Sequence, residues 1–212
     1  AGLKPHDGMS VFLIDIRGLH NKGLEIKPLR SMINHSSCEV FFDNLRIPTS
    51  CLIGDEGRGF RYILDGMNAE RILIAFEAIG DARWFIQKAT EYSKERIVFD
   101  RPIGQNQGIQ FPIAESYAEM SAARLMVQEA ARLFDSSLTC AKEANIAKFL
   151  SSEASWKAGD ACMQTFGGFG FAEEYDVERK FRETRLFRTA PISSNLILSY
   201  IAEHVLGLPR SF

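Results

Sequence analysis

The stretch ERILIAFEAIG, residues 70–80, decides the fold class of this 212-residue chain. Its main apolar side chains recur at the spacing of one helix face, and they are Ile72, Leu73, Phe76 and Ile79. Residues three or four positions apart share one side of an α-helix, so the stretch predicts an amphipathic helix. The pattern continues to about Arg96 and predicts a first long helix.

Further helices are predicted downstream. One apolar face marks the second, with residues Ile113, Tyr117, Met120 and Val127. The third runs from about Ala141 to Thr165 and ends at the pair Gly167-Gly168, which can cap a helix. Glycines in front of the second helix, Gly104 and Gly108, place a loop between the first two helices.

The fourth helix is predicted to start near Asp176 or Val177. We expect it to break at Pro191, because proline removes a backbone N–H and clashes with the preceding turn. Four helices with connecting loops favour an α-bundle, and the fold class predicted for the chain is mainly α.

The part of the chain before the first helix carries strand signals. The run MSVFLIDI, Met9–Ile16, is short, apolar and bounded by glycines, as a buried strand would be. Two more candidate strands are Cys38–Asp43 and Cys51–Ile53. We therefore predict two domains, a β part over residues 1–54 and a four-helix bundle over residues 55–212.

Composition excludes several classes of protein. A formal net charge of -2 leaves no basic surface for nucleic acid. No stretch approaches the roughly 20 consecutive apolar residues that a membrane span needs. The four cysteines lie far apart without CxxC pairing, which argues against a structural metal or a disulfide framework and favours reduced thiols.

Three segments could carry binding chemistry: ERIVFDRPIGQNQ (95–107), QTFGGFGF (164–171) and DVERKFRETRLFR (176–188). In the first, Arg96 could hold a phosphate, although a helix-end arginine is also favoured by the helix dipole alone. In the second, the glycines let a ligand approach closely, although a helix cap explains them equally. The third is typical of an exposed helix packed on one side.

Taken together and in this order, the three segments resemble the acyl-CoA dehydrogenase family. That family carries ERxxFGxPI-like and QxxGGxGF-like stretches and a closing VERxxRDxR-like helix in its C-terminal half. The resemblance covers essentially the entire chain, because CEVFFDNLRIP and IGDEGRGF look like the end of the family's middle β-barrel domain and its lead into the bundle.

The resemblance implies an FAD site shared between subunits. Arg96 would bind the FAD pyrophosphate of a neighbouring subunit, Phe99 would lie against the adenine, and Gln107 would donate a nearby hydrogen bond. Three residues would approach the FAD across the interface: Gln164, Gly167 and Gly168. The family usually has a glycine at the position of Asp100. This difference affects the expected conformation of the local turn and not the expected FAD role.

The resemblance also implies a catalytic carboxylate that removes the proton α to the thioester carbonyl. Many members place this glutamate where an ungapped alignment puts Pro191. A minority, resembling isovaleryl-CoA and long-chain acyl-CoA dehydrogenases, takes it from an ER pair on the first bundle helix, here Glu70-Arg71. We therefore assign the base to Glu70, with Arg71 orienting the site, and expect burial to raise the pKa of Glu70. Met67 and Asn68 would lie near the substrate.

The leading functional prediction is FAD-dependent α,β-dehydrogenation of an acyl-CoA, with an electron-transferring flavoprotein as acceptor and a homotetramer or dimer as the assembly. Pro191 has no N–H to polarise the thioester carbonyl, so Ile192 or another neighbour would have to donate. Two alternatives remain: a flavin oxidase or monooxygenase of the same fold, and a non-catalytic subunit that completes a partner's FAD site. The implied compartment is the cytoplasm for a bacterial source and the mitochondrial matrix for a eukaryotic one.

Overall fold

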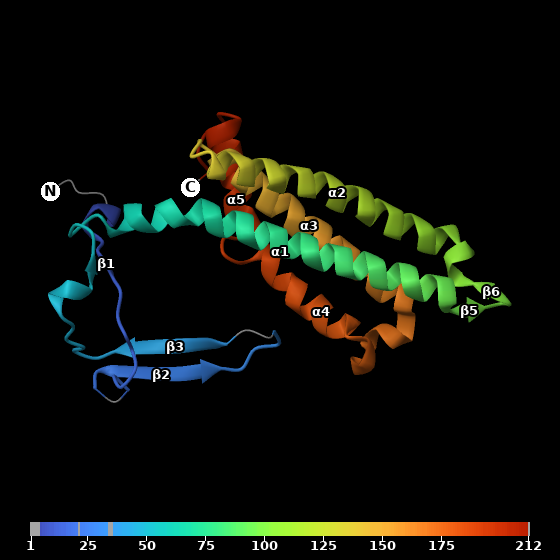
Figure 1. Ribbon diagram of the computed structural model, residues 1–212, viewed down its shortest axis with the longest axis horizontal. Coiled ribbons are helices and arrows are strands. Elements are labelled where there is room, and N and C mark those ends of the chain that lie inside the picture. The colour runs from blue at the N-terminus through green and yellow to red at the C-terminus, as the bar shows by residue number, and fades with distance from the viewer. Residues whose placement is uncertain (1–4, 21, 34–35, 212) are drawn as a thin grey trace. The chain divides into compact units, whose positions relative to one another are not determined.

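The computed structural model describes residues 5–20, 22–33 and 36–211. It confirms the mainly α fold class, with a helical C-terminal region and few strands (Figure 1). Its contacts divide the chain into two compact units, Ala1–Met67 and Asn68–Phe212. The border of these units lies inside a helix, and the domain boundary after residue 54 remains a proposal.

The first unit contains short antiparallel strands. β2 (Leu24–Leu29) pairs with β3 (Ser37–Phe42), and β1 (Val11–Phe12) pairs with β4 (Leu52–Ile53). The strands predicted at Cys38–Asp43 and Cys51–Ile53 are confirmed to within a residue. β2 was not predicted, because its sequence LEIKPL contains a proline, which is uncommon inside strands.

The prediction of a buried strand at Met9–Ile16 is wrong. Its strand is limited to Val11–Phe12, and the side chain of Leu13 is 74% exposed. An apolar run is buried only where another layer covers it. In the described part of this unit, Leu24 is the only apolar side chain that is buried.

The second unit is a bundle of helices, to which α1 contributes all but its first turns (Figure 1). The α-helices are α1 (Gly59–Glu95), α2 (Gln107–Asp135), α3 (Ala141–Phe166), α4 (Val177–Thr184) and α5 (Ser194–Tyr200). A two-stranded hairpin, β5 (Ile97–Val98) with β6 (Arg101–Pro102), follows α1. Shorter helical turns are Pro5–Gly8, Thr49–Cys51, Ile103–Gln105, Gly167–Phe171, Glu173–Tyr175, Arg185–Arg188 and the π-helical Ile201–Val205.

The predicted helices are present with small shifts. α2 begins at Gln107, so Gly108 lies in its first turn instead of the preceding loop. The expected interruption near Pro191 is also found, but α4 already ends at Thr184 and a 3-10 turn follows it.

Small side chains bring the helices of the second unit close together. α3 buries a row of alanines against α1 and α2: Ala144, Ala147, Ala154 and Ala158. A Cβ atom on Gly159 would lie 3.1 Å from Phe181 and 3.3 Å from Phe85. The centre of the bundle therefore depends on the small volume of the residues on α3.

Candidate active site

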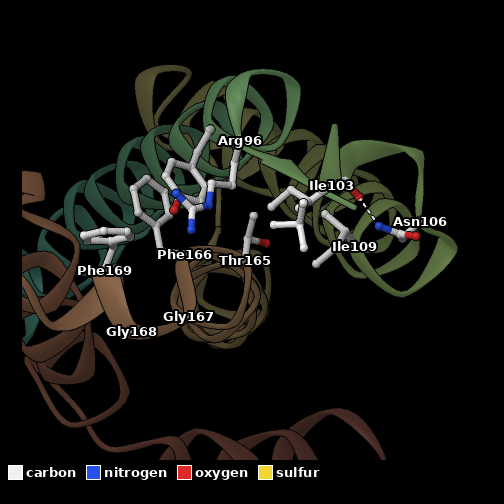
Figure 2. Close-up of a pocket in the computed structure, with 11 residues that line it drawn as sticks. Arg96, Ile103, Asn106, Ile109, Thr165, Phe166, Gly167, Gly168 and Phe169 are labelled. Carbon is white, nitrogen blue, oxygen red and sulfur yellow. Dashed lines mark hydrogen bonds between the residues drawn. The ribbon is translucent and has the colours of Figure 1, made fainter. Parts of the chain in front are cut away.

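A cavity of about 570 Å³ lies in the second unit where α1 and α3 end (Figure 2). Its walls come from the end of α1, the β5–β6 hairpin, the start of α2 and the end of α3. The volume falls within the roughly 300 to 1,000 Å³ of small-molecule sites. The cavity brings together three predicted binding residues: Arg96, Gly167 and Gly168.

Arg96 is the one charged residue among the described residues that line this cavity. Its N–H donates to the Tyr92 carbonyl and its own carbonyl accepts from the Ile103 N–H, each at 2.9 Å. The guanidinium lies 5.5 Å from the centre of the Phe169 ring, a cation–π contact (Figure 2). The backbone of Arg96 is thus fixed on both sides, and its charge faces the open cavity.

Gly167 terminates α3 in a conformation that requires glycine. Its φ of 56° and ψ of -129° lie in a region that side chains rarely adopt. The predicted helix cap is confirmed, since the Gly167 N–H donates to the Met163 carbonyl. That amide is therefore used within the protein. A Cβ atom on Gly167 or Gly168 would meet nothing within 4 Å, so the space beside the pair is open.

Aromatic rings line the cavity beside Arg96. Tyr92 stacks on Phe166 with ring centres 4.1 Å apart, and the edge of Tyr175 contacts Phe166 and Phe169. These residues were not singled out from the sequence. Tyr92 precedes Arg96 by four residues, so helical spacing could have indicated it. Phe166 and Phe169 flank the glycine pair, and that position could have indicated them.

Three other predicted cofactor contacts lie outside the cavity lining: Phe99, Gln107 and Gln164. Gln107 begins α2, and both glutamines are exposed. Asn106, which was not predicted, lines the cavity instead, and its Nδ2 donates to the Ile103 carbonyl at 2.9 Å (Figure 2).

Phe99 and Asp100 form the turn of the β5–β6 hairpin, with φ values of 51° and 61°. Two consecutive left-handed residues are the mark of a type I′ turn. Aspartate tolerates this region better than most residues, so Asp100 supports the turn in place of glycine. Phe99 is bulky and 92% exposed, which makes its conformation unusual.

A second polar cluster surrounds Arg71 on α1. Its Nη1 donates to Asn68 Oδ1 at 3.0 Å, and its Nε is buried with no partner among the residues that the structure describes. Burial lowers the pKa of Arg71, while the nearby Tyr200 and Glu70 oppose that shift. Glu70 is exposed, so the expected burial of its carboxylate is not provided by the described residues. Met67 is partly buried one residue before Asn68.

Residues 57–206 match the family described as Acyl-CoA dehydrogenase, C-terminal domain. The chain belongs to the acyl-CoA dehydrogenase family. It is 40% identical over 176 residues to an acyl-CoA dehydrogenase of Mycobacterium bovis, covering 82% of this chain and 45% of the relative.

Solved structures of the family agree with the fold. A glutaryl-coenzyme A dehydrogenase in complex with glutaryl-CoA matches with a TM-score of 0.91 and 30% identity, covering 97% of this chain and 52% of that one. A structure of PigA with FAD and proline matches with a TM-score of 0.90 and 27% identity, covering 96% and 53%. The chain thus spans about half the length of the relatives it matches.

The described residues contain no group of three or more His, Cys, Asp or Glu side chains placed to hold a metal ion. No helix in the same part of the chain is long and apolar enough to cross a membrane.

Proposed function

We propose that the protein containing this chain is an FAD-dependent acyl-CoA dehydrogenase that removes hydrogen from the α and β carbons of an acyl-CoA thioester. The observation that carries the proposal is the cavity that joins Arg96 to the open space beside Gly167 and Gly168. Family membership gives the reaction class, and the cavity supplies the charge and the clearance that a flavin dinucleotide needs.

FAD fits the residues that are present. Arg96 would pair with the pyrophosphate, because a guanidinium binds phosphate oxygens through two parallel hydrogen bonds. The glycine pair would admit the cofactor without a Cβ clash. Bound FAD would supply the acceptor for a hydride from the substrate. Phe99, Gln107 and Gln164 lie outside this lining, and we propose that they meet FAD across an interface in a homotetramer or dimer.

Glu70 is the proposed base that takes the α-proton. Its carboxylate lies on α1 beside Arg71, whose side chain is held by Asn68. Among the residues that the structure describes, the Arg71 Nε has no hydrogen-bond partner, which leaves one donor available to orient a neighbouring group. Met67 and Asn68 would lie along the substrate. An electron-transferring flavoprotein is the proposed acceptor.

The test uses the complete protein that contains this chain, reconstituted with FAD under anaerobic conditions. Branched, aromatic-linked and long-chain acyl-CoAs are added one at a time while flavin absorbance is recorded. We expect at least one to bleach the flavin. If dithionite bleaches the flavin and no acyl-CoA does, dehydrogenation is excluded.

Pro191 favours a second candidate, a non-catalytic subunit that completes an FAD site. In that case the protein binds FAD stoichiometrically and no thioester reduces it. A flavin oxidase or monooxygenase is distinguished by rapid oxygen consumption after substrate reduction, because a dehydrogenase that uses a flavoprotein acceptor reoxidises slowly in air.

A further inference from the structure

Lys148 on α3 is buried completely, which is unusual for a lysine. Its Nζ donates a hydrogen bond of 2.7 Å to the carbonyl oxygen of Ile192, 44 residues further along the chain. Ile192 directly follows Pro191, the residue that cannot donate an N–H to the thioester. The mechanism proposed above gives no role to this ammonium group.

Lys148 belongs to a row of polar side chains on α3 that hydrogen-bond the end of α4 and the chain after it. Ser155 and Thr184 share a hydrogen bond between their hydroxyls, and the Ser152 hydroxyl lies 2.9 Å from the Phe187 carbonyl. Residues 148, 152 and 155 are separated by four and three positions, so they share one helix face. Lys148 makes the last of these hydrogen bonds before α5.

The hydrogen bond from Lys148 also orients the next amide. The Ile192–Ser193 peptide bond is trans, so its carbonyl oxygen and its N–H point in opposite directions. Because the carbonyl points to Lys148, the Ser193 N–H points away from it. Within the described residues this N–H, like that of Ile192, makes no hydrogen bond.

The same region adjoins the proposed catalytic residues on α1. Burial lowers the pKa of Lys148 to about 8; the charge of Glu153 opposes this shift, and the charge of Arg71 adds to it. Arg71 in turn interacts with Glu70 and Tyr200. Arg71 therefore interacts both with Glu70 and with Lys148, the residue that binds the Ile192 carbonyl.

We propose that Lys148 is a positioning residue for dehydrogenation: it holds the Ile192 carbonyl inside the bundle, so that the Ser193 N–H donates to the thioester carbonyl in place of the N–H that Pro191 lacks. This inference rests on the proposed function. The donated hydrogen bond stabilises negative charge that develops on the carbonyl oxygen as the α-proton leaves.

Ser193→Pro tests the donor directly. Ser193 has φ -68° and ψ 150°, which proline adopts without strain, so the substitution removes the N–H and the hydroxyl that caps α5. Ser193→Ala removes the hydroxyl alone and measures the effect of losing the cap of α5. Loss of an oxyanion donor costs about 100-fold in kcat. We expect Ser193→Pro to reduce flavin about 100-fold more slowly than Ser193→Ala, with KM little changed.

Lys148→Met tests the positioning, with Lys142→Met as the control on the same helix. Lys142 is 54% exposed and pairs with Glu143. In the complete holoprotein we expect Lys148→Met to speed hydrogen–deuterium exchange of residues 189–195 at least tenfold while the rest of α3 stays protected. Bound cinnamoyl-CoA, whose absorption moves to longer wavelength when its carbonyl is polarised, should lose that shift in Lys148→Met and in Ser193→Pro.

Unchanged exchange in Lys148→Met would overturn the positioning role. Equal rates for Ser193→Pro and Ser193→Ala would overturn the donor. A purely structural lysine would lower thermal stability and leave the spectrum of bound cinnamoyl-CoA unaltered. If no acyl-CoA reduces the flavin of the wild-type protein, the proposed function fails and the donor role of Ser193 fails with it. The exchange measurement then still decides whether Lys148 holds residues 189–195 in place.

Discussion

The two polar regions of the helical unit each contain one dominant basic residue, and they use it in opposite ways. Arg96 is exposed, its charge faces an open cavity, and its guanidinium lies over the aromatic ring of Phe169. Lys148 is fully buried, and its charge is directed at a backbone carbonyl. The first arrangement leaves a cation free to hold a ligand, whereas the second uses a cation to hold the protein itself.

The largest effect is expected for Glu70→Gln, which keeps the shape of the side chain and removes its basicity. General base catalysis contributes about 10² to 10⁴ in rate, so flavin reduction by a good acyl-CoA should fall by about 10³-fold. Rapid-mixing absorbance under anaerobic conditions measures it. Glu129→Gln, an exposed carboxylate paired with Arg132 on α2, is the matched control. A rate within threefold of the wild type would place the base elsewhere.

Arg96→Ala should weaken FAD binding next most strongly. Hydrogen bonds to charged groups contribute about 1.5–3 kcal/mol, so the Kd should rise about 10- to 100-fold. Arg96→Lys should restore part of the loss, because an ammonium keeps the charge without the planar fork. Titration calorimetry with FAD gives both values, and Arg124→Ala on α2 controls for loss of an exposed arginine. Equal affinity in Arg96→Ala would remove this cavity from the FAD site.

Lys148 should make stability depend on pH. Its pKa falls from 10.5 to about 8 in the folded protein, so between these values the unfolded chain binds more protons and the unfolding free energy rises with pH. The rise is at most about 3 kcal/mol, complete near pH 10.5 and absent below pH 8. The unfolding free energy of Lys148→Met should not show this rise. Denaturant titrations of both proteins at pH 7.5 and 10 measure the difference. Parallel curves for the two proteins would mean that the lysine titrates normally.

Gly167→Ala and Gly168→Ala separate backbone conformation from space. Both Cβ atoms would enter open space, but only Gly167 has a positive φ. Strain of this kind costs about 1–3 kcal/mol, so Gly167→Ala should lower the unfolding free energy and Gly168→Ala should not. Calorimetric melting of both variants provides the comparison. Equal melting temperatures would contradict the cap geometry.

Phe169→Leu should have the smallest effect. A cation–π contact at an exposed site contributes about 0.5–1 kcal/mol, so the Kd for FAD should rise about two- to fivefold. The same calorimetric titration detects this change, and Phe171→Leu, at a ring that lies outside the cavity lining, is the control. An effect as large as that of Arg96→Ala would mean that Phe169 contacts the cofactor itself.

Local sequence predicted part of the Arg96 region. The end of α3 was predicted to within a residue, because a glycine pair after an amphipathic helix is a local signal. The helix-end pattern marked Arg96 only as a possible phosphate-binding residue, and the family resemblance implied its role toward FAD. Asn106 was missed because its position in the cavity depends on the turn over Ile103–Gln105, which brings it back beside α1.

The Lys148 region could not be predicted in the same way. A lysine on a helix is expected to be exposed, and its neighbours on α3 are small or polar, without a strong apolar face. Its burial is caused by the chain after α4, whose carbonyls meet this face across 35 to 44 residues. Such a site depends on tertiary hydrogen bonds, and helical periodicity carries no information about them.

The hairpin turn at Phe99 and Asp100 has a consequence for how the sequence can evolve. Asparagine and glycine suit its two left-handed positions far better than phenylalanine and aspartate do. A laboratory selection for heat resistance alone should therefore enrich Phe99→Asn and Asp100→Gly. A selection that also demands growth on an acyl substrate should retain Phe99 if the exposed ring meets another subunit. These two selections would therefore show whether thermal stability and activity favour different residues at positions 99 and 100.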